Sequence, residues 1–294
     1  MKYAWIKDHR AEFPVNAMCQ VLAVSRSGFY KSLHAKPSQR AVRSQRIREQ
    51  VKQLHEQSHC TYGSYKISKA MNKNEEFESA CRNTVAKAMQ EMGLKNRIRK
   101  KFKPKTTQVD PSKKPAKNLL DQVFTTDMPN RKWVTDITYL ATNGGWVYLA
   151  CVLDPFSRKI VGWAISDSLE TPLVSRALRN AIQSRRPDTT KLLHHSDRGC
   201  QYTSGDYQKT LDTLGITCSM NHVGYCYDNA VMERFFWSLK HEWTNHYQYV
   251  DLEEARLSVF KYIDTFYNTE RIHQTLHYVS PDLFEEKYHQ TIAV

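Results

Sequence analysis

The sequence predicts an α/β domain built on a mixed sheet, preceded by a small all-α region. Three observations lead to this fold class. Residues 1–94 carry apolar residues at helical spacing, residues 95–127 are basic and punctuated by proline, and several β-rich segments follow residue 128. We therefore expect a helical region over 1–94, a basic linker over 95–127 and an α/β core over 128–294.

The positive charge is unevenly distributed along the chain. The 294 residues include 43 Lys and Arg against 30 Asp and Glu, a formal net charge of +13. Residues 82–117 alone hold twelve Lys and Arg and only two acidic residues. A surplus of this size favours a polyanionic partner, either nucleic acid or an anionic membrane. No stretch has the roughly 18 apolar residues that span a bilayer, and no secretory signal is evident, so we expect a cytoplasmic protein.

The helical region contains two candidates for a helix-turn-helix. In the first, a helix over 16–22 is followed by a turn at residues 23–25, and Ser25 or Ser27 can cap a second short helix. The second consists of helices over 45–55, 64–71 and 82–92, the last ended by Gly93. The last helix carries Arg82, Asn83 and Lys87 opposite its apolar face, and these residue types contact bases and phosphates. The alternative is a small helical bundle with a solvated basic face.

The pattern after the linker alternates as strands do. We expect three strands joined by tight turns, of which the first is the Asn143-Gly144 hairpin, then a helix, a short buried strand and three further helices. The strands are expected over 133–140, 145–153, 159–165 and 191–195, and the helices over 171–184, 204–214, 228–243 and 251–267. This order indicates a mixed sheet, which we expect to have five strands, flanked by helices.

Three acidic residues in this core have unusual placements. Asp136 lies in the middle of the first strand, Asp197 directly follows the fourth strand, and Glu233 lies among apolar residues of a helix. Carboxylate oxygens suit Mg²⁺ and Mn²⁺, and two such ions can activate a hydroxyl and stabilise the leaving oxygen of a phosphodiester. Any one of these acids could instead be a helix cap or a salt-bridge partner. The spacing of the three therefore decides between these roles and a metal site.

The spacing and the surrounding residues resemble a known family. Sixty residues separate Asp136 from Asp197, and 35 separate Asp197 from Glu233, which is similar to the D-D-35-E pattern of retroviral integrases and DDE transposases. The segments 133–139, 195–202 and 227–240 resemble three motifs of the IS-three type of bacterial insertion-sequence transposase, in particular the second reading-frame product. Tyr267, Asn268, Arg271, His273 and the Ser280-Pro281 pair resemble the usual end of that family.

This resemblance implies an RNase H-like integrase core that depends on Mg²⁺, with Mn²⁺ as a substitute and two ions per site. It implies that Asp136, Asp197 and Glu233 are the catalytic, metal-binding residues. The implied reaction is strand cleavage and transfer by direct transesterification at terminal inverted repeats of double-stranded DNA. The resemblance also implies a homo-oligomer on DNA, associated with the nucleoid in a bacterial cytoplasm. It further implies that an upstream reading-frame product is fused to the protein or assists it.

Further DNA contacts are expected near the acids. Lys240 lies two helical turns after Glu233, so both side chains share a helix face, and its ammonium can contact a phosphate. The alternative is a solvated helix lysine. Arg198 and Tyr202 follow Asp197 closely and are also expected to touch DNA. The residues of the family's usual end could bind DNA or could tie the last helix to the core.

Two other functions remain open at this point. A hydrolytic RNase H-like nuclease would explain the acids but not the helical region. A catalytically silent DNA-binding regulator of transposition would explain the basic helical region, although a silent remnant is expected to have lost at least one of the three acids.

Overall fold

A computed structural model describes residues 2–34, 36, 38–97, 116–121, 123–221 and 229–292. Most of the expected linker, and Tyr227 and Asp228 of the third motif, lie outside the described residues. None of the helices within the described ranges is both long and apolar enough to cross a membrane.

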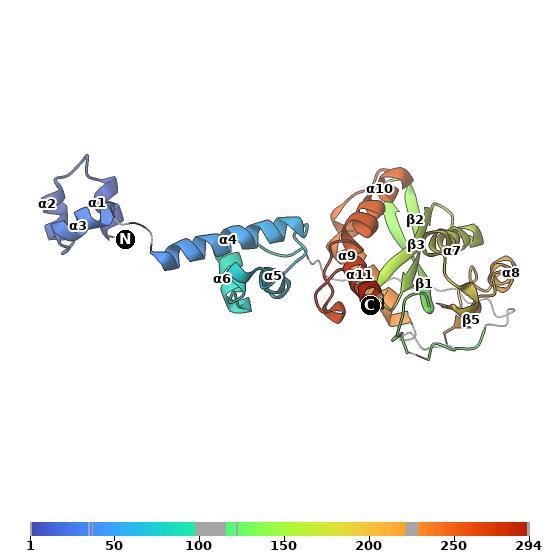
Figure 1. The fold of residues 1–294 in the computed structure, drawn as a ribbon. Coiled ribbons are helices and arrows are strands. Elements are labelled where there is room, and N and C mark those ends of the chain that lie inside the picture. Colours follow the sequence, from blue (N-terminus) through green and yellow to red (C-terminus); the bar gives the residue numbers. More distant parts are fainter. Residues whose placement is uncertain are drawn as a thin grey trace.

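The first three helices form a small unit of their own. They are α1 (Lys2–Asp8), α2 (Val15–Val21) and α3 (Arg26–Leu33), and they pack around Ile6, Met18 and Phe29. Ser25 caps α3, because its side chain accepts a hydrogen bond from the Gly28 amide at 3.0 Å. The first candidate helix-turn-helix therefore has the expected elements, and α1 is an additional helix that the sequence did not predict. Figure 1 shows this unit at the end of the molecule away from the sheet.

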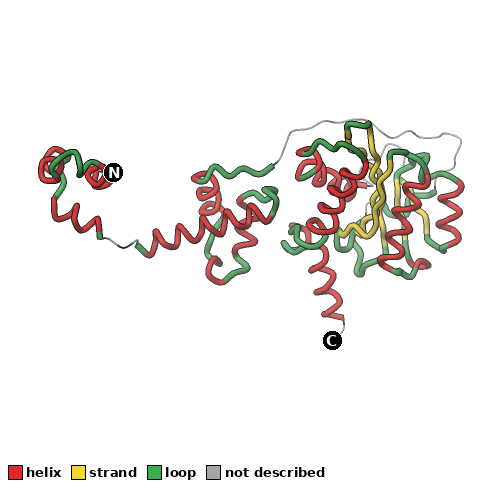
Figure 2. The backbone as a smooth tube through the Cα atoms, turned by 90° about the horizontal axis from the view of Figure 1, so that it is seen from above, coloured by secondary structure: helices red, strands yellow, loops and turns green. Residues whose placement is uncertain are grey.

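The second helical unit lies between α3 and the sheet, as Figures 1 and 2 show. It comprises α4 (Gln39–Gln57), α5 (Ser64–Met71), a short 3₁₀ turn η1 (Glu75–Phe77) and α6 (Arg82–Glu91). The start of α4 is earlier than predicted because Ser38 caps it, accepting from the Ala41 amide at 3.2 Å. The interior of this second helical unit is formed by Val51, Ile67, Met71 and Val85.

The core is a five-stranded mixed sheet in the order β3-β2-β1-β4-β5. Strands β1, β2 and β3 pair antiparallel, whereas β4 runs parallel to both β1 and β5. Their bounds are β1 (Lys132–Thr142), β2 (Gly145–Asp154), β3 (Lys159–Ser166), β4 (Leu193–Ser196) and β5 (Thr217–Met220). The predicted hairpin is confirmed, since Thr142 pairs with Gly145 across it. Five strands were expected and are present, but the position of β5 was not predicted.

Helices cover both faces of this sheet (Figures 1 and 2). Trp133, Ala150 and Val161 pack on one face against α7 (Thr171–Arg185) and α8 (Gly205–Thr213). Val134 and Leu149 pack on the other face against helices that follow in the chain. These are α9 (Ala230–Glu242), α10 (Leu252–Tyr262) and η5 (Ile263–Tyr267), a π-helical turn that continues α10. Short 3₁₀ turns lie at η2 (Thr189–Lys191), η4 (Thr244–His246) and η6 (Gln274–Leu276).

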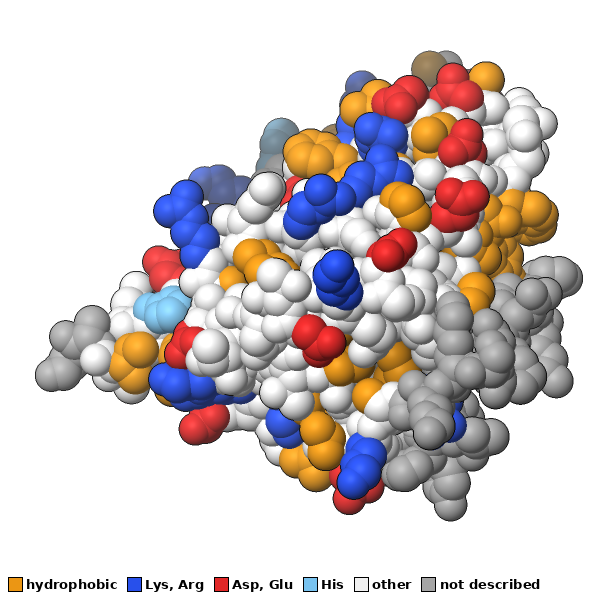
Figure 3. All heavy atoms as spheres, turned by 90° about the vertical axis from the view of Figure 1, so that its right-hand side faces the viewer, with side chains coloured by type: hydrophobic (Ala, Val, Ile, Leu, Met, Phe, Trp, Pro, Cys, Tyr) orange, Lys and Arg blue, Asp and Glu red, His pale blue; other side chains and the backbone are white. Residues whose placement is uncertain are grey.

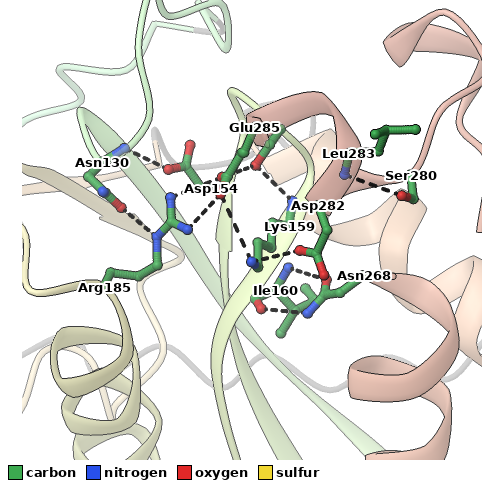
Figure 4. A network of polar contacts seen from close by, with 11 residues as sticks. Asn130, Asp154, Lys159, Ile160, Arg185, Asn268, Ser280, Asp282, Leu283 and Glu285 are labelled. Carbon is green, nitrogen blue, oxygen red and sulfur yellow. Dashed lines mark hydrogen bonds and ion pairs between the residues drawn. The ribbon is translucent and has the colours of Figure 1, made fainter. Parts of the chain in front are cut away.

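The last helix, α11 (Pro281–Ile292), was not predicted and is fastened to the sheet by polar contacts (Figure 4). Glu285 accepts two hydrogen bonds from the Arg185 guanidinium, at 2.6 and 2.9 Å. Asp282 pairs with Lys159 at 2.6 Å. The Asn268 amide accepts from the Ile160 amide at 3.0 Å and donates to its carbonyl at 2.9 Å. These contacts fix the edge strand β3 between α7 and the end of the chain.

The end of the core that lies farthest from the first helices carries charges of both signs (Figure 3). Lys and Arg side chains are interspersed there with Asp and Glu, and white polar surface separates them. The net positive charge of the chain is therefore not gathered into one basic field on this face.

Candidate active site

Strand β1 places Asp136 on the face that α9 covers. Val134, two residues earlier, belongs to the hydrophobic cluster of that face, whereas Trp133 belongs to the cluster on the opposite face. Because side chains alternate along a strand, Asp136 lies on the same face as Val134. The Asp136 carboxylate is half-buried, and its Oδ1 accepts a hydrogen bond from the Ile137 amide at 2.8 Å.

The parallel pairing of β1 with β4 brings Asp197 alongside Asp136. Val134 is in register with His195, so the residues two positions further on in each chain lie next to each other. Asp197 Oδ1 accepts from the Gly199 amide at 2.9 Å. A Cβ atom on Gly199 would lie 3.0 Å from that same oxygen, so the absence of a side chain there makes room for the carboxylate.

Three hydrogen bonds hold the end of β4 and the Asp197 loop against β5 and the residue that follows it. The His195 ring bonds the Ser219 hydroxyl at 2.8 Å and the Asn221 side chain at 2.5 Å. Arg198 donates from Nε to the Asn221 carbonyl at 2.6 Å. The acid thus lies on a loop fixed by the neighbouring strand, which is what a site with defined geometry requires.

Helix α9 runs along β1 and supplies the third acid. Asn229, at its start, donates to the Thr135 carbonyl at 3.3 Å, next to Asp136. Near its end, Lys240 Nζ lies 4.2 Å from the centre of the Tyr139 ring. Glu233 lies in the first turn of the helix, and its side chain is exposed. Asn229 lies within the third motif, and its contact with β1 cannot be deduced from local sequence.

The charges of these groups act on one another. Burial raises the pKa of Asp136 well above its ordinary value, and the negative charges of Asp197 and Glu233 raise it further, against a lowering by the Ile137 amide and by Lys240. Burial also raises the pKa of Asp197, although the Gly199 amide opposes this. Burial lowers the pKa of Lys240, which the Asp136 charge partly restores. A cation placed between Asp136 and Asp197 would relieve their repulsion.

The donor set suits a hard divalent cation. Among the described residues, the hydrogen bonds engage Oδ1 of Asp136 and Oδ1 of Asp197 and leave the second oxygen of each carboxylate without a hydrogen-bond donor. Within the same residues, however, no three His, Cys, Asp or Glu side chains lie close enough together to hold one ion. The sequence-predicted residues therefore come together as a pair, Asp136 and Asp197, with the exposed Glu233 nearby on α9.

The prediction that Tyr202 contacts DNA is wrong for this structure. Its side chain is 1% exposed, its hydroxyl lies 3.2 Å from the Thr135 hydroxyl, and its ring packs edge-on against Tyr207. Tyr202 instead connects the Asp197 loop to β1, beside Asp136. Proximity in sequence to Asp197 suggested a contact, but the side chain points into the core.

The three predicted DNA-contacting side chains of α6 are exposed. Asn83 and Lys87 lie on its outer surface, and the Arg82 guanidinium lies 6.0 Å from the centre of the Tyr65 ring. The apolar residue Val85 points inward, as predicted. The structure thus presents this basic face to solvent, away from the core of the second helical unit.

The residues that end the core have structural partners. Asn268 is bound to the backbone of Ile160, as described above. Arg271 is buried and forms an ion pair with Glu242 at 2.7 Å. Its guanidinium also lies 3.2 Å from His273 Nε2. The sequence left two roles open for these residues, DNA binding and attachment of the last segment to the core. The contacts of Asn268 and Arg271 are those of the second role.

Sequence families match residues 43–102 and 126–281 of the chain. A family described as an HTH-like domain matches residues 43–102, which favours the second of the two helix-turn-helix candidates. Two families described as integrase core domains match residues 126–226 and 214–281. The fold and the families together define a DNA-joining enzyme of the integrase-core class, polynucleotidyl transferases that depend on metal ions.

Full-length relatives narrow this class to one family. The chain is 38% identical over 276 residues to the insertion element IS600 uncharacterized 31 kDa protein of Shigella sonnei, covering 94% of this chain and all of the relative. It is 37% identical over 290 residues to the transposase InsF for insertion sequence IS3A of Escherichia coli (strain K12), covering 98% and 99% of the two chains. The chain belongs to the IS3-type family of insertion-sequence transposases and is a DNA transposase.

Solved structures of integrases share lower similarity with the chain. The catalytic core of HTLV-2 integrase in complex with magnesium is 16% identical, with a TM-score of 0.39, and the match covers 50% of this chain and 92% of that one. The catalytic core of BIV integrase is 18% identical, with a TM-score of 0.41, and the match covers 55% and 99%.

Proposed function

We propose that the transposase cleaves and joins DNA strands at the terminal inverted repeats of its insertion sequence, through the acids Asp136, Asp197 and Glu233. The observation that carries this proposal is the parallel β1–β4 pair, in which Val134 lies opposite His195. It supports a place for Asp136 beside Asp197, and the contact of Asn229 with the Thr135 carbonyl supports a place for α9, and with it Glu233, along the same part of β1. The reaction is a direct transesterification. The oxygen of a water or of a DNA 3′-hydroxyl bonds to phosphorus while the bond from phosphorus to the leaving 3′-oxygen breaks.

The three carboxylates would hold Mg²⁺, or Mn²⁺ in its place, as two ions per site. When bound, such ions stabilise the charge on the attacking and leaving oxygens. The surrounding residues hold the acids and the DNA in position. The Gly199 amide orients Asp197, Asn229 fixes the start of α9 against β1, and Lys240 supplies a positive charge to a phosphate near the acids.

Several parts of the chain would bind DNA. We propose that α6 uses Arg82, Asn83 and Lys87 to contact the terminal repeats, which its exposed face and the HTH-like match support. Lys240 and Arg198 would contact the DNA near the acids. Among the described residues, the hydrogen bond of Arg198 is from Nε to the Asn221 carbonyl, and its terminal nitrogens would contact the DNA. The proposed domains are the helical DNA-binding region 1–94, the basic linker 95–127 and the catalytic core 128–294.

The working enzyme would be a homo-oligomer assembled on DNA, because two element ends must be joined in one reaction, and an upstream reading-frame product would be fused to it or would assist it. It would act in a bacterial cytoplasm, on the nucleoid, which its similarity to insertion-sequence proteins of Shigella sonnei and Escherichia coli supports. The alternatives of a hydrolytic nuclease and of a silent regulator have no observation in their favour.

A strand-transfer assay tests this proposal. Labelled DNA carrying the element's ends is incubated with the protein and Mg²⁺ or Mn²⁺, beside Asp197→Asn and beside Asp212→Asn, an exposed acid of α8 that serves as the matched control. We expect metal-dependent joined products with the wild type and the control, and none with Asp197→Asn. Cleavage without joining would indicate the nuclease, and binding without either reaction the regulator.

A further inference from the structure

A cavity of about 230 Å³ lies between α5, α9 and the segment 271–275. Its lining is strongly cationic. Lys66 comes from α5, Arg158 from the turn after β2, and Arg234 and Arg271 from α9 and the closing segment. Val231 and Phe235 form an apolar wall of the same cavity. One helix of the front region, α5, and the catalytic core thus contribute to one pocket.

The positive charge in this pocket exceeds the negative charge beside it. Arg271 is neutralised by Glu242, whose carboxylate it binds through two hydrogen bonds of 2.7 Å. Among the described residues, no carboxylate lies within ion-pair distance of Lys66, Arg158 or Arg234. Each of these three side chains meets aromatic or cationic neighbours instead; Lys66 lies 4.9 Å from the centre of the Tyr62 ring.

Burial makes this excess of positive charge unfavourable. Desolvation, followed by the charges of Arg271 and Arg234, lowers the pKa of Lys66 to about 7, although Glu242 opposes the change. Desolvation and four surrounding cations also lower the pKa of His273 well below its ordinary value, so the imidazole is neutral at pH 7. Uncompensated cations packed this closely destabilise the folded chain, so their presence together indicates an anionic ligand.

The chemistry of the lining favours a phosphate group. Guanidinium groups bind phosphate oxygens through paired N–H donors, and three cations of separate origin can surround one anion. The pocket lies on the face of α9 formed by Val231, Arg234, Phe235 and Ser238, and Arg234 directly follows Glu233. A phosphate held here would lie within one helical turn of the proposed catalytic acid.

We propose that this pocket binds a backbone phosphate of the DNA substrate and that the phosphate fastens the HTH-like helices to the catalytic core. The inference rests on the proposed function, which supplies the polyanion. The two parts already meet at this place, because the Tyr62 hydroxyl, at the start of α5, accepts from the Ile272 amide at 2.8 Å. Lys66 then reaches the phosphate from the HTH-like side while Arg158 and Arg234 reach it from the core.

Two full-length variants remove one charge each from opposite walls of the pocket. Lys66→Gln keeps most of the side-chain length, and Arg158→Asn suits the left-handed backbone at that residue, where φ is +61°. Lys209→Gln is the matched control, since it removes an exposed lysine from α8 on the other face of the sheet. Neither test variant alters a proposed catalytic acid.

Binding is measured without divalent metal, by fluorescence anisotropy of a labelled duplex carrying the element's end, between about 50 and 200 mM salt. We expect each pocket variant to bind about tenfold more weakly. Its logarithmic salt dependence should be shallower by about 1, as for one lost phosphate contact. Inorganic phosphate, compared with chloride at equal ionic strength, should raise the melting temperature of the wild type and of Lys209→Gln but not of the pocket variants. Without phosphate, the pocket variants should melt no lower than the wild type.

Two other outcomes overturn the inference. Unchanged affinity and salt dependence, together with phosphate stabilisation that persists in the variants, would show that the pocket binds no phosphate. If stabilisation by inorganic phosphate is lost while DNA binding is unchanged, the pocket binds a free anion and not DNA. Failure of strand transfer by the wild type would instead contradict the proposed function, and would leave the binding results to be judged by themselves.

Discussion

Replacing Arg271 by methionine tests whether a buried ion pair holds the closing segment onto α9. The Arg271 and Glu242 side chains are only 6% and 8% exposed, and two hydrogen bonds of 2.7 Å join them. Arg271→Met leaves the Glu242 carboxylate buried with the Tyr262 hydroxyl, at 2.9 Å, as its remaining donor. Removing one partner of such a pair lowers the free energy of unfolding by about 3–5 kcal/mol, since the other charge stays buried and uncompensated.

The effect is measured by urea unfolding followed by circular dichroism. Because the free energy of unfolding falls by about 1–3 kcal/mol per molar urea, the midpoint of Arg271→Met should lie at least about 1 M below that of the wild type. The double variant Glu242→Gln/Arg271→Met has no buried charge at this place. It should therefore regain at least about 1 kcal/mol of the loss.

Two results would refute this reasoning. A midpoint for Arg271→Met within about 0.3 M of the wild type would mean that the pair contributes little to stability. A double variant less stable than Arg271→Met would mean that the unpaired Glu242 charge is not the cause of the loss.

Three further predictions concern the site and the sheet. Asp136→Asn should abolish strand transfer yet raise the melting temperature of the metal-free protein at pH 7. The folded protein raises the pKa of this carboxyl above 3.8, so the stability of the wild type should fall as the pH rises from about 4. If the melting temperature of Asp136→Asn falls as steeply with pH, this reasoning is contradicted. Gly162→Ala should cost about 1–3 kcal/mol in urea unfolding, because the new Cβ would lie 2.5 Å from backbone atoms of Ala177 and Ala181, whereas Gly205→Ala, with open space, should cost nothing. Lys240→Gln should slow strand transfer at least about tenfold with little change in melting temperature, and normal rates would mark Lys240 as a helix lysine without a DNA contact.

The strands that alternate strongly could be predicted from the sequence. Residues 132–166 form three of them within one or two residues of the expected bounds, because each is long and has a β-rich pattern. Strand β5 (Thr217–Met220) has four residues and little alternation, so its formation depends on its pairing with β4, which local sequence does not reveal. Helix α11 depends likewise on Arg185 and Lys159, which are distant in sequence and hold its acids.

Only those features of the site that depend on residue type and spacing could be predicted from the sequence. The intervals between Asp136, Asp197 and Glu233 indicated these acids as candidates, and the parallel strand register then explains why two of them lie close together. The direction in which a loop side chain points is set by tertiary packing, so Tyr202 was assigned wrongly. The cationic pocket could not be predicted at all, since its members come from four separate segments, Lys66 among them.

One hydrophobic cluster runs continuously from the second helical unit into the sheet, and this sets where the chain can be divided. It includes Val51 and Met71 from the helices together with Phe266 and Trp243 from the core. The His59 ring lies edge-on to the last two, at 5.1 and 4.9 Å. A fragment that starts at residue 128 would leave these aromatic rings facing water. Expression of the core by itself therefore calls for polar replacements on that surface, or for a fragment that keeps α4 to α6.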